Sequence, residues 1–232
     1  MILKLAITVV ALQASFILTA SPVMAQRSNF QAWSQLTTQF AIGHERKWLF
    51  YLEAQPRFSD NSSRFDRFFI RPAFGYNYDK DINFYLGYAW TPRYLDNSYQ
   101  SDFRNENRIW QHLVVRKAAL GINWVHGLRQ EQRLFAGVSA VSNRFSYQLR
   151  GSYKMSESQD FGLTAFQILF LNLNSVENGP RAGFDRARAF FGPYLTIKSA
   201  RYEVGYLGEY GKRFGNEDRM INALMLSAIF NF

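Results

Sequence analysis

The sequence predicts an all-β protein, a single antiparallel transmembrane β-barrel, from three observations. Polar or charged residues alternate with apolar ones along most of the chain, which is the period-two pattern of strands with one apolar face. After the N-terminal leader no run approaches the roughly 18 apolar residues of a spanning helix, so a closed barrel is the remaining way to cross a bilayer. Aromatic residues make up 17% of the chain, as an apolar outer band with aromatic girdles requires.

The N-terminal residues 1–25 have the pattern of a secretory signal peptide. Lys4 supplies a positive charge before an apolar stretch, and Val23-Met24-Ala25 has short side chains at the positions that a signal peptidase reads. We expect cleavage before Gln26, which leaves 26–232 as one barrel domain. An N-terminal membrane anchor is the disfavoured alternative, because the apolar run is short.

The first two strands are expected at 30–42 and 47–58, joined by a turn. In the first strand apolar and small residues share one face and glutamines the other. In the second, aromatic and aliphatic residues face outward, and Glu53, Gln55 and Arg57 face inward.

The third and fourth strands are expected at 64–78 and 82–91. Arg67 and Arg71 lie on the inward face of the third strand, opposite large apolar residues, and the fourth strand has the cleanest alternation in the chain. The polar and aromatic stretch 92–105 then reads as a long extracellular loop.

The fifth and sixth strands are expected at about 106–116 and 121–134. The fifth carries Glu106, Arg108 and His112 on one face. The sixth contains Arg129-Gln130-Glu131-Gln132-Arg133, in which every second residue is charged, so that the charged side chains share a face.

The seventh and eighth strands are expected at about 144–153 and 161–171. Arg144 and Arg150 share the polar face of the seventh. The eighth is almost wholly apolar, which leaves its facing open. A second long loop is expected at 172–183.

The last three strands are expected at about 186–195 and 202–210 and in the segment that ends at Phe232. The ninth presents Arg186 and Arg188 inward, and the tenth presents Glu203 and Glu209 inward.

The C-terminus predicts the compartment. Phe230 and Phe232 end a series of apolar residues at every second position, which resembles the signal that the barrel assembly machinery reads in outer-membrane proteins. With the leader, this predicts a monomer in the lipid of a Gram-negative outer membrane. The absence of cysteine excludes thiolate metal sites and suits an oxidising compartment. A soluble periplasmic sandwich is the alternative.

The number of strands follows less directly from the alternation. The alternation gives eleven segments, whereas single-chain bacterial barrels have an even number of strands. We therefore expect twelve strands, with ten as the alternative.

The inward face has a surplus of arginine over acid. On this register eleven arginines and five glutamates point inward, and the net charge of the chain is +9. Arginine suits the planar recognition of carboxylate and phosphate. One hypothesis is a narrow channel for small anionic solutes, since arginine rings set anion selectivity in pores. The other is a structural barrel closed by cross-strand ion pairs, with no transport role.

These hypotheses assign roles to two sets of inward residues. The residues expected to form lumen ion pairs are Glu53, Arg57, Glu106, Arg108, Arg129, Glu131 and Arg133. The arginines expected to lack a nearby acid, and so to bind anions, are Arg67, Arg71, Arg144, Arg150, Arg186 and Arg188.

Catalysis has little support in the sequence. His112 is the inward histidine, and no serine or acid pattern points to it. An outer-membrane lipid-modifying enzyme is therefore a third and weaker hypothesis. We expect no cofactor and no metal site, and no nucleic-acid binding, because the arginines alternate with outward aromatic residues.

Several motifs carry a resemblance to a known family. They are Glu106-x-Arg108-x-Trp110-Gln111, Gly127-Leu128-Arg129-x-Glu131-Gln132-Arg133, Arg144-Phe145-x-Tyr147-x-Leu149-Arg150, Phe170-Leu171-Asn172-Leu173-Asn174 and Arg186-Ala187-Arg188-x-Phe190-x-Gly192. Across 27–232 the chain resembles a bacterial family of outer-membrane barrels, a domain of unknown function. The resemblance implies fold and location but no activity. Gln167 departs from the family pattern, where a glutamate is expected.

A second likeness is to small monomeric porins for acidic oligosaccharides, which are similar in length and lined with arginine. It is an analogy at the level of the fold, without a shared motif. It implies acidic oligosaccharides as one class of solute for a channel.

Overall fold

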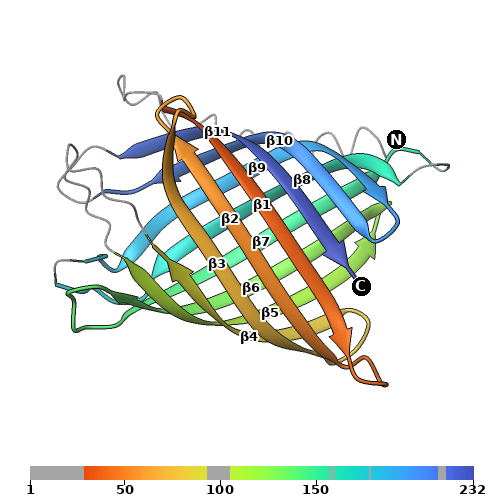
Figure 1. Cartoon of the computed structure of the whole chain (residues 1–232), viewed down its shortest axis with the longest axis horizontal. Helices are drawn as coiled ribbons and strands as arrows, with labels where there is room; N and C mark the ends of the chain where they lie inside the picture. The colour runs from red at the N-terminus through yellow and green to blue at the C-terminus, as the bar shows by residue number, and fades with distance from the viewer. Residues whose placement is uncertain (1–28, 93–104, 157, 159, 178, 214–217) are drawn as a thin grey trace.

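The computed structural model describes residues 29–92, 105–156, 158, 160–177, 179–213 and 218–232, which form a closed β-barrel (Figure 1). The expected leader 1–25 lies outside the described residues, as does most of the expected loop 92–105. In the described part of the chain no helix is long and apolar enough to cross a membrane.

The barrel wall consists of consecutive strands that follow the alternating segments of the sequence. Its eleven strands in the described residues are β1 Asn29–Ile42, β2 Trp48–Ser59, β3 Arg64–Asn77, β4 Ile82–Thr91, β5 Glu106–Ala119, β6 Ile122–Phe135, β7 Ser142–Lys154, β8 Phe161–Asn172, β9 Gly183–Ile197, β10 Ala200–Gly211 and β11 Arg219–Asn231. The predicted segments therefore correspond one to one with the strands.

The ring is an up-and-down meander that closes on itself. Each strand pairs antiparallel with its neighbours in the chain, and β1 pairs with β11 in parallel, from Asn29↔Ile221 to Gln39↔Asn231. Figure 1 shows β1 and β11 side by side, pointing the same way. The C-terminal Phe232 prolongs this seam, because its N–H donates to the carbonyl of Gln39 at 2.9 Å.

The strand count differs from the expected twelve, and from ten. The described residues close the ring with eleven strands. In a meander with an odd number of strands the first and last run in the same direction, so the ring closes only through a parallel pair. The even-number rule assumes an antiparallel closure, and β1 and β11 do not follow it.

Short turns join the strands at the end of the barrel where the chain finishes. Leu120 and Gly121 connect β5 to β6 with φ of 55° and 73°. Two consecutive positive φ values define the hairpin turn whose twist matches that of paired strands. The sequence placed this turn at 117–120, so β5 extends further than expected.

The facing of the side chains follows the period of two. Glu53, Gln55 and Arg57 on β2 are buried in the barrel, whereas Trp48 on the same strand points outward with 60% of its surface exposed. Tertiary structure also orients β8, whose facing the sequence left open. Its inward side chains are those of Thr164, Phe166, Ile168, Phe170 and Asn172.

Gln167 consequently points outward. Its neighbours Phe166 and Ile168 face the interior. The residue that departs from the family pattern is therefore not a substitute for an acid inside the barrel.

The interior of the barrel is packed rather than open. One apolar cluster gathers Trp33, Phe166, Phe190, Leu207, Ile221, Ala223 and Met225. A second gathers Leu49, Ala73, Tyr85, Ala89, Trp110 and Val114. Small barrels have room for little more than their own side chains. These clusters fill much of the inside and leave the charged residues in a low-dielectric setting.

The outer face is apolar and slightly hollowed over the seam. Strand pairing is interrupted beside Pro56 and Pro193, since proline has no N–H to donate to a neighbouring strand. Between these positions a groove of ≈640 Å³ crosses the outer surface, with Leu36, Tyr202 and Leu226 among its lining residues.

Candidate functional site

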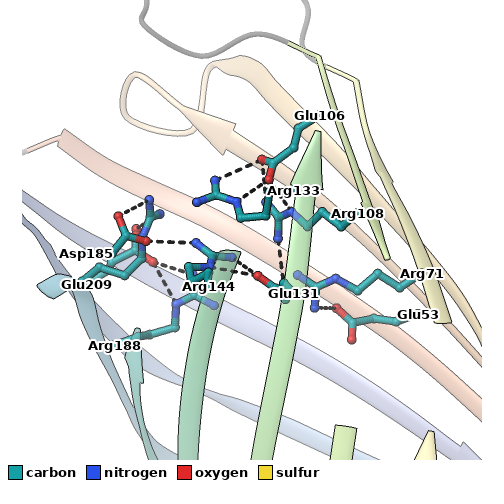
Figure 2. A network of polar contacts seen from close by, with 11 residues as sticks. Glu53, Arg71, Glu106, Arg108, Glu131, Arg133, Arg144, Asp185, Arg188 and Glu209 are labelled. Atoms are coloured by element: carbon teal, nitrogen blue, oxygen red, sulfur yellow. Dashed lines mark hydrogen bonds and ion pairs between the residues drawn. The ribbon is translucent and has the colours of Figure 1, made fainter. Parts of the chain in front are cut away.

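Nine arginines and acids inside the barrel form one continuous chain of ion pairs near the end where the strands meet the longer loops (Figure 2). The sign of the charge alternates from one member to the next. Its nine members in order are Arg133, Glu106, Arg108, Glu131, Arg144, Asp185, Arg186, Glu209 and Arg188.

Glu106 and Glu131 hold the first part of the chain together. Arg108 donates two hydrogen bonds to Glu106, at 2.7 Å and 2.8 Å, and Arg133 donates to the same carboxylate. Glu131 lies 3.6 Å from Arg108 and accepts a hydrogen bond at 2.8 Å from Arg144. Each carboxylate therefore serves two guanidinium groups on different strands.

Asp185 connects the first part of the chain of ion pairs to residues on β9 and β10. It accepts a hydrogen bond at 2.9 Å from Arg144 and another at 3.0 Å from Arg186. Arg186 also contacts Glu209 at 3.3 Å, and Glu209 binds Arg188. The sequence prediction missed Asp185, because strict alternation places it on the opposite face from Arg186.

A β-bulge explains how Asp185 reaches the interior. Pairing of β8 with β9 passes from Phe170↔Arg186 to Leu171↔Phe184, which leaves Asp185 as the extra residue. A bulge reorients one side chain and locally resets the alternation.

The same bulge occurs a second time in the barrel. Pairing of β2 with β3 passes from Arg57↔Arg67 to Phe58↔Phe65, so Asp66 is the extra residue, and Arg67 donates to it at 2.8 Å. Both bulges contain the tripeptide Phe-Asp-Arg, at 65–67 and 184–186. This repeated tripeptide is the sequence signal that could have identified the two missed acids.

Besides the Arg67–Asp66 pair, two smaller groups of ion pairs inside the barrel lie apart from the chain of ion pairs. Arg71 donates to Glu53 at 3.0 Å, and Tyr51 donates to the other oxygen of Glu53 at 2.6 Å. Nearer the short turns, Glu203 accepts hydrogen bonds from Arg150 at 2.6 Å and from Arg201 at 2.8 Å.

The arginines predicted to lack a nearby acid all contact one. Arg67 pairs with Asp66, Arg71 with Glu53, and Arg150 with Glu203. The other three, Arg144, Arg186 and Arg188, belong to the chain of ion pairs. Their role in anion binding stays a prediction, but the premise that they are unpaired is wrong. The pairing partners lie far away in sequence or on bulges.

The predicted ion-pair set divides in two. Five of its members make the ion pairs described above: Glu53, Glu106, Arg108, Glu131 and Arg133. Arg57 and Arg129 make no ion pair with a carboxylate of the described residues. Arg57 instead donates to Gln55 at 2.9 Å and stacks on Trp33, with its guanidinium carbon 3.5 Å from the ring centroid.

Arg129 takes a histidine and a tryptophan as neighbours. It lies 3.3 Å from Nδ1 of His112, and its guanidinium sits 4.9 Å from the ring centroid of Trp110. An arginine can only donate, so Nδ1 accepts and His112 is the neutral tautomer with its proton on Nε2. His112 is therefore held inside the barrel as a hydrogen-bond acceptor.

The two terminal phenylalanines lie on the outer face. Phe230 and Phe232 stack with ring centroids 6.2 Å apart, and Phe230 meets Tyr202 edge to face. Their role as an assembly signal stays a prediction.

The described part of the chain contains no candidate metal site. No group of three histidines, aspartates or glutamates there is placed to hold a metal ion. The acids face guanidinium groups instead.

The comparisons with known proteins concern the whole barrel. A family model described as “Protein of unknown function (DUF2490)” matches residues 30–220. An uncharacterised protein of Methylorubrum extorquens strain AM1 is 30% identical over 184 residues, which cover 77% of each chain. No solved structure matches significantly.

Proposed function

Since the chain belongs to the DUF2490 family, whose description assigns no activity, we propose a function from the barrel itself: a monomeric outer-membrane barrel whose lumen is closed by ion pairs. The observation that carries this proposal is the alternating chain of nine charged residues across the interior. Together with the two apolar clusters, it occupies the space that an open pore would need.

The distribution of apolar surface supports a membrane location. Large apolar side chains point outward around the ring, among them Trp48, Phe74 and Leu86, each at least 60% exposed. The charged residues lie inside. A water-soluble barrel has the opposite arrangement, whereas a barrel in lipid presents an apolar band outward.

Cell fractionation tests the location. The full chain, expressed with its leader in a Gram-negative host, should appear in the outer-membrane fraction without residues 1–25. Recovery of the folded barrel in the soluble periplasmic fraction would refute the membrane proposal.

The terminal phenylalanines give a matched test of assembly. Phe232→Ala should lower the amount of folded barrel in the outer membrane, because the assembly machinery reads this residue. Phe191→Ala is the control, since Phe191 is also an outward phenylalanine, at 47% exposure, but lies far from the C-terminus. Equal assembly of the two variants would remove the assigned role of Phe232.

Planar-bilayer recording separates the closed barrel from an anion channel. A closed lumen gives no discrete conductance steps in the wild type. Steps whose reversal potential shows anion preference would replace the proposal with the channel for small anionic solutes, including acidic oligosaccharides. In that case the paired arginines would have to separate from their acids when the channel opens.

A further inference from the structure

A cavity lies inside the barrel beside the chain of ion pairs. It has a volume of ≈170 Å³ and is lined by side chains from β1 to β3 and from β5 to β11. A cavity of about 150 Å³ accommodates a benzene-sized molecule, so this one has room for a small solute. Its charged lining residues are Glu53, Arg71, Arg129, Glu131, Arg150 and Arg188.

Three of the four lining arginines have an ion-pair partner among the contacts already described. Arg71 has Glu53, Arg150 has Glu203, and Arg188 has Glu209. The remaining lining acid, Glu131, is engaged by Arg144 and Arg108, which do not line the cavity.

Arg129 is the fourth, and the described residues give it no carboxylate. Its neighbours are His112, which is neutral in this arrangement, and the ring of Trp110. The Nε atoms of Arg129 and Arg71 are both buried without a hydrogen-bond partner. Two guanidinium groups at the same cavity thus have unused donors.

A buried guanidinium that makes no direct ion pair is costly. Withdrawing an ion from water is repaid only by good ionic geometry and further hydrogen bonds. A buried donor without a partner adds its own desolvation penalty.

We propose that this cavity binds one small oxyanion, a free carboxylate, sulfate or phosphate, with Arg129 as its counter-charge. A planar guanidinium matches two oxygens of such a group, and Arg71 supplies a second donor. The inference goes beyond the closed barrel, which needs no ligand. It depends on the interior alone and holds whether or not the barrel lies in a membrane.

The test uses the folded wild-type barrel in a neutral detergent, with ionic strength held constant by sodium chloride. Sodium sulfate, phosphate and acetate are titrated separately while thermal unfolding is followed by circular dichroism, and affinity is measured by calorimetry. At least one anion should raise the unfolding temperature saturably, because a ligand that binds only the folded state stabilises it.

Arg129→Gln tests the assigned residue. It should weaken binding at least about tenfold, the loss expected for one charge-assisted hydrogen bond. Without anion it should unfold at the same temperature as the wild type or higher, since the variant lacks a buried charge that makes no direct ion pair.

Arg186→Gln is the matched control. Arg186 is also an inward arginine, but it contacts Asp185 and Glu209 and does not line the cavity. This variant should lose stability and keep the wild-type affinity for the anion. A purely structural role for Arg129 would give both variants the same loss of stability.

Ser146→Leu keeps the test decisive if Arg129→Gln fails to fold. Ser146 lines the cavity, so the larger side chain occupies it without removing a charge. It should abolish the anion response. Absence of a saturable response to all three anions in the wild type overturns the proposal, as does an unchanged response in Arg129→Gln or in Ser146→Leu. Neither cell fractionation nor conductance enters this assay, so its failure is distinct from failure of the proposed function.

Discussion

Glu131→Gln removes the carboxylate at the middle of the chain of ion pairs while keeping its shape. Glu131 is only 2% exposed, and it joins Arg144 to Arg108 across three strands. The amide keeps one oxygen acceptor but turns an N–H₂ group toward a guanidinium. The variant therefore replaces attraction by repulsion at a site without access to bulk water.

The magnitude follows from the contacts that are lost. A hydrogen bond to a charged group contributes about 1.5–3 kcal/mol. Breaking a buried ion pair by removing one partner costs about 3–5 kcal/mol. Arg144 keeps Asp185 and Arg108 keeps Glu106, so neither cation is left alone. We expect the lower end of that range, about 3 kcal/mol in the free energy of unfolding.

The assay is reversible urea unfolding in detergent micelles, followed by tryptophan fluorescence. Glu45→Gln is the control, because the Glu45–Lys47 pair has side-chain exposures of 75% and 53%. An exposed pair contributes about 0–1 kcal/mol. If Glu131→Gln loses no more stability than Glu45→Gln, the chain of ion pairs does not hold the barrel together and the reasoning is refuted.

Two further predictions concern the wall and the loop end. A Cβ added at Gly192 would lie 2.0 Å from the carbonyl oxygen of Val204, so Gly192→Ala should lower the free energy of unfolding by about 3 kcal/mol or prevent folding. Gly208→Ala is the control, because a Cβ there would have its nearest contact at 3.6 Å. It should change stability by less than about 0.5 kcal/mol in the same urea assay. Equal effects would show that the close approach of β9 and β10 does not require glycine. At the loop end, Tyr210 donates to Asp218, and this hydrogen bond lowers the pKa of the Asp218 carboxyl. A carboxyl group whose pKa is lower in the folded state stabilises the protein at pH values above its unfolded-state pKa, and this contribution is lost as the pH falls through the folded-state pKa. Because Tyr210→Phe removes the hydrogen bond, it should raise the pKa of Asp218 in a carboxyl NMR titration. An unchanged pKa would assign the shift to the other two donors to Asp218, the backbone N–H of Arg213 and the ammonium of Lys212.

The local pattern of polar and apolar residues was sufficient to predict most of the barrel wall. The period-two alternation located every strand, because each strand exposes one face to the interior and one to the outside whatever its partners are. It failed on β8, where both faces are apolar, and near Asp66 and Asp185, where one extra residue resets the alternation.

Pairing of charges could not be read from the alternation. Glu131 and Arg129 share a strand and a face, yet Glu131 binds Arg108 and Arg144 on the neighbouring strands. The partner of an inward residue depends on strand register and on the curvature of the ring. For this reason the arginines expected to be unpaired contact acids, and Arg129, expected to be paired, makes no ion pair with the described residues.

The sequence by itself determined a barrel of alternating strands with arginine inside and aromatic residues outside. Only the tertiary structure decided that the ring closes through a parallel seam, that most of the interior is filled, and that one arginine lines a cavity without a direct ion pair among the described residues. The physical reason is the range of the interactions. Facing is set by each residue and its immediate neighbours in the chain, whereas closure, filling and charge balance depend on strands that meet only in the folded ring.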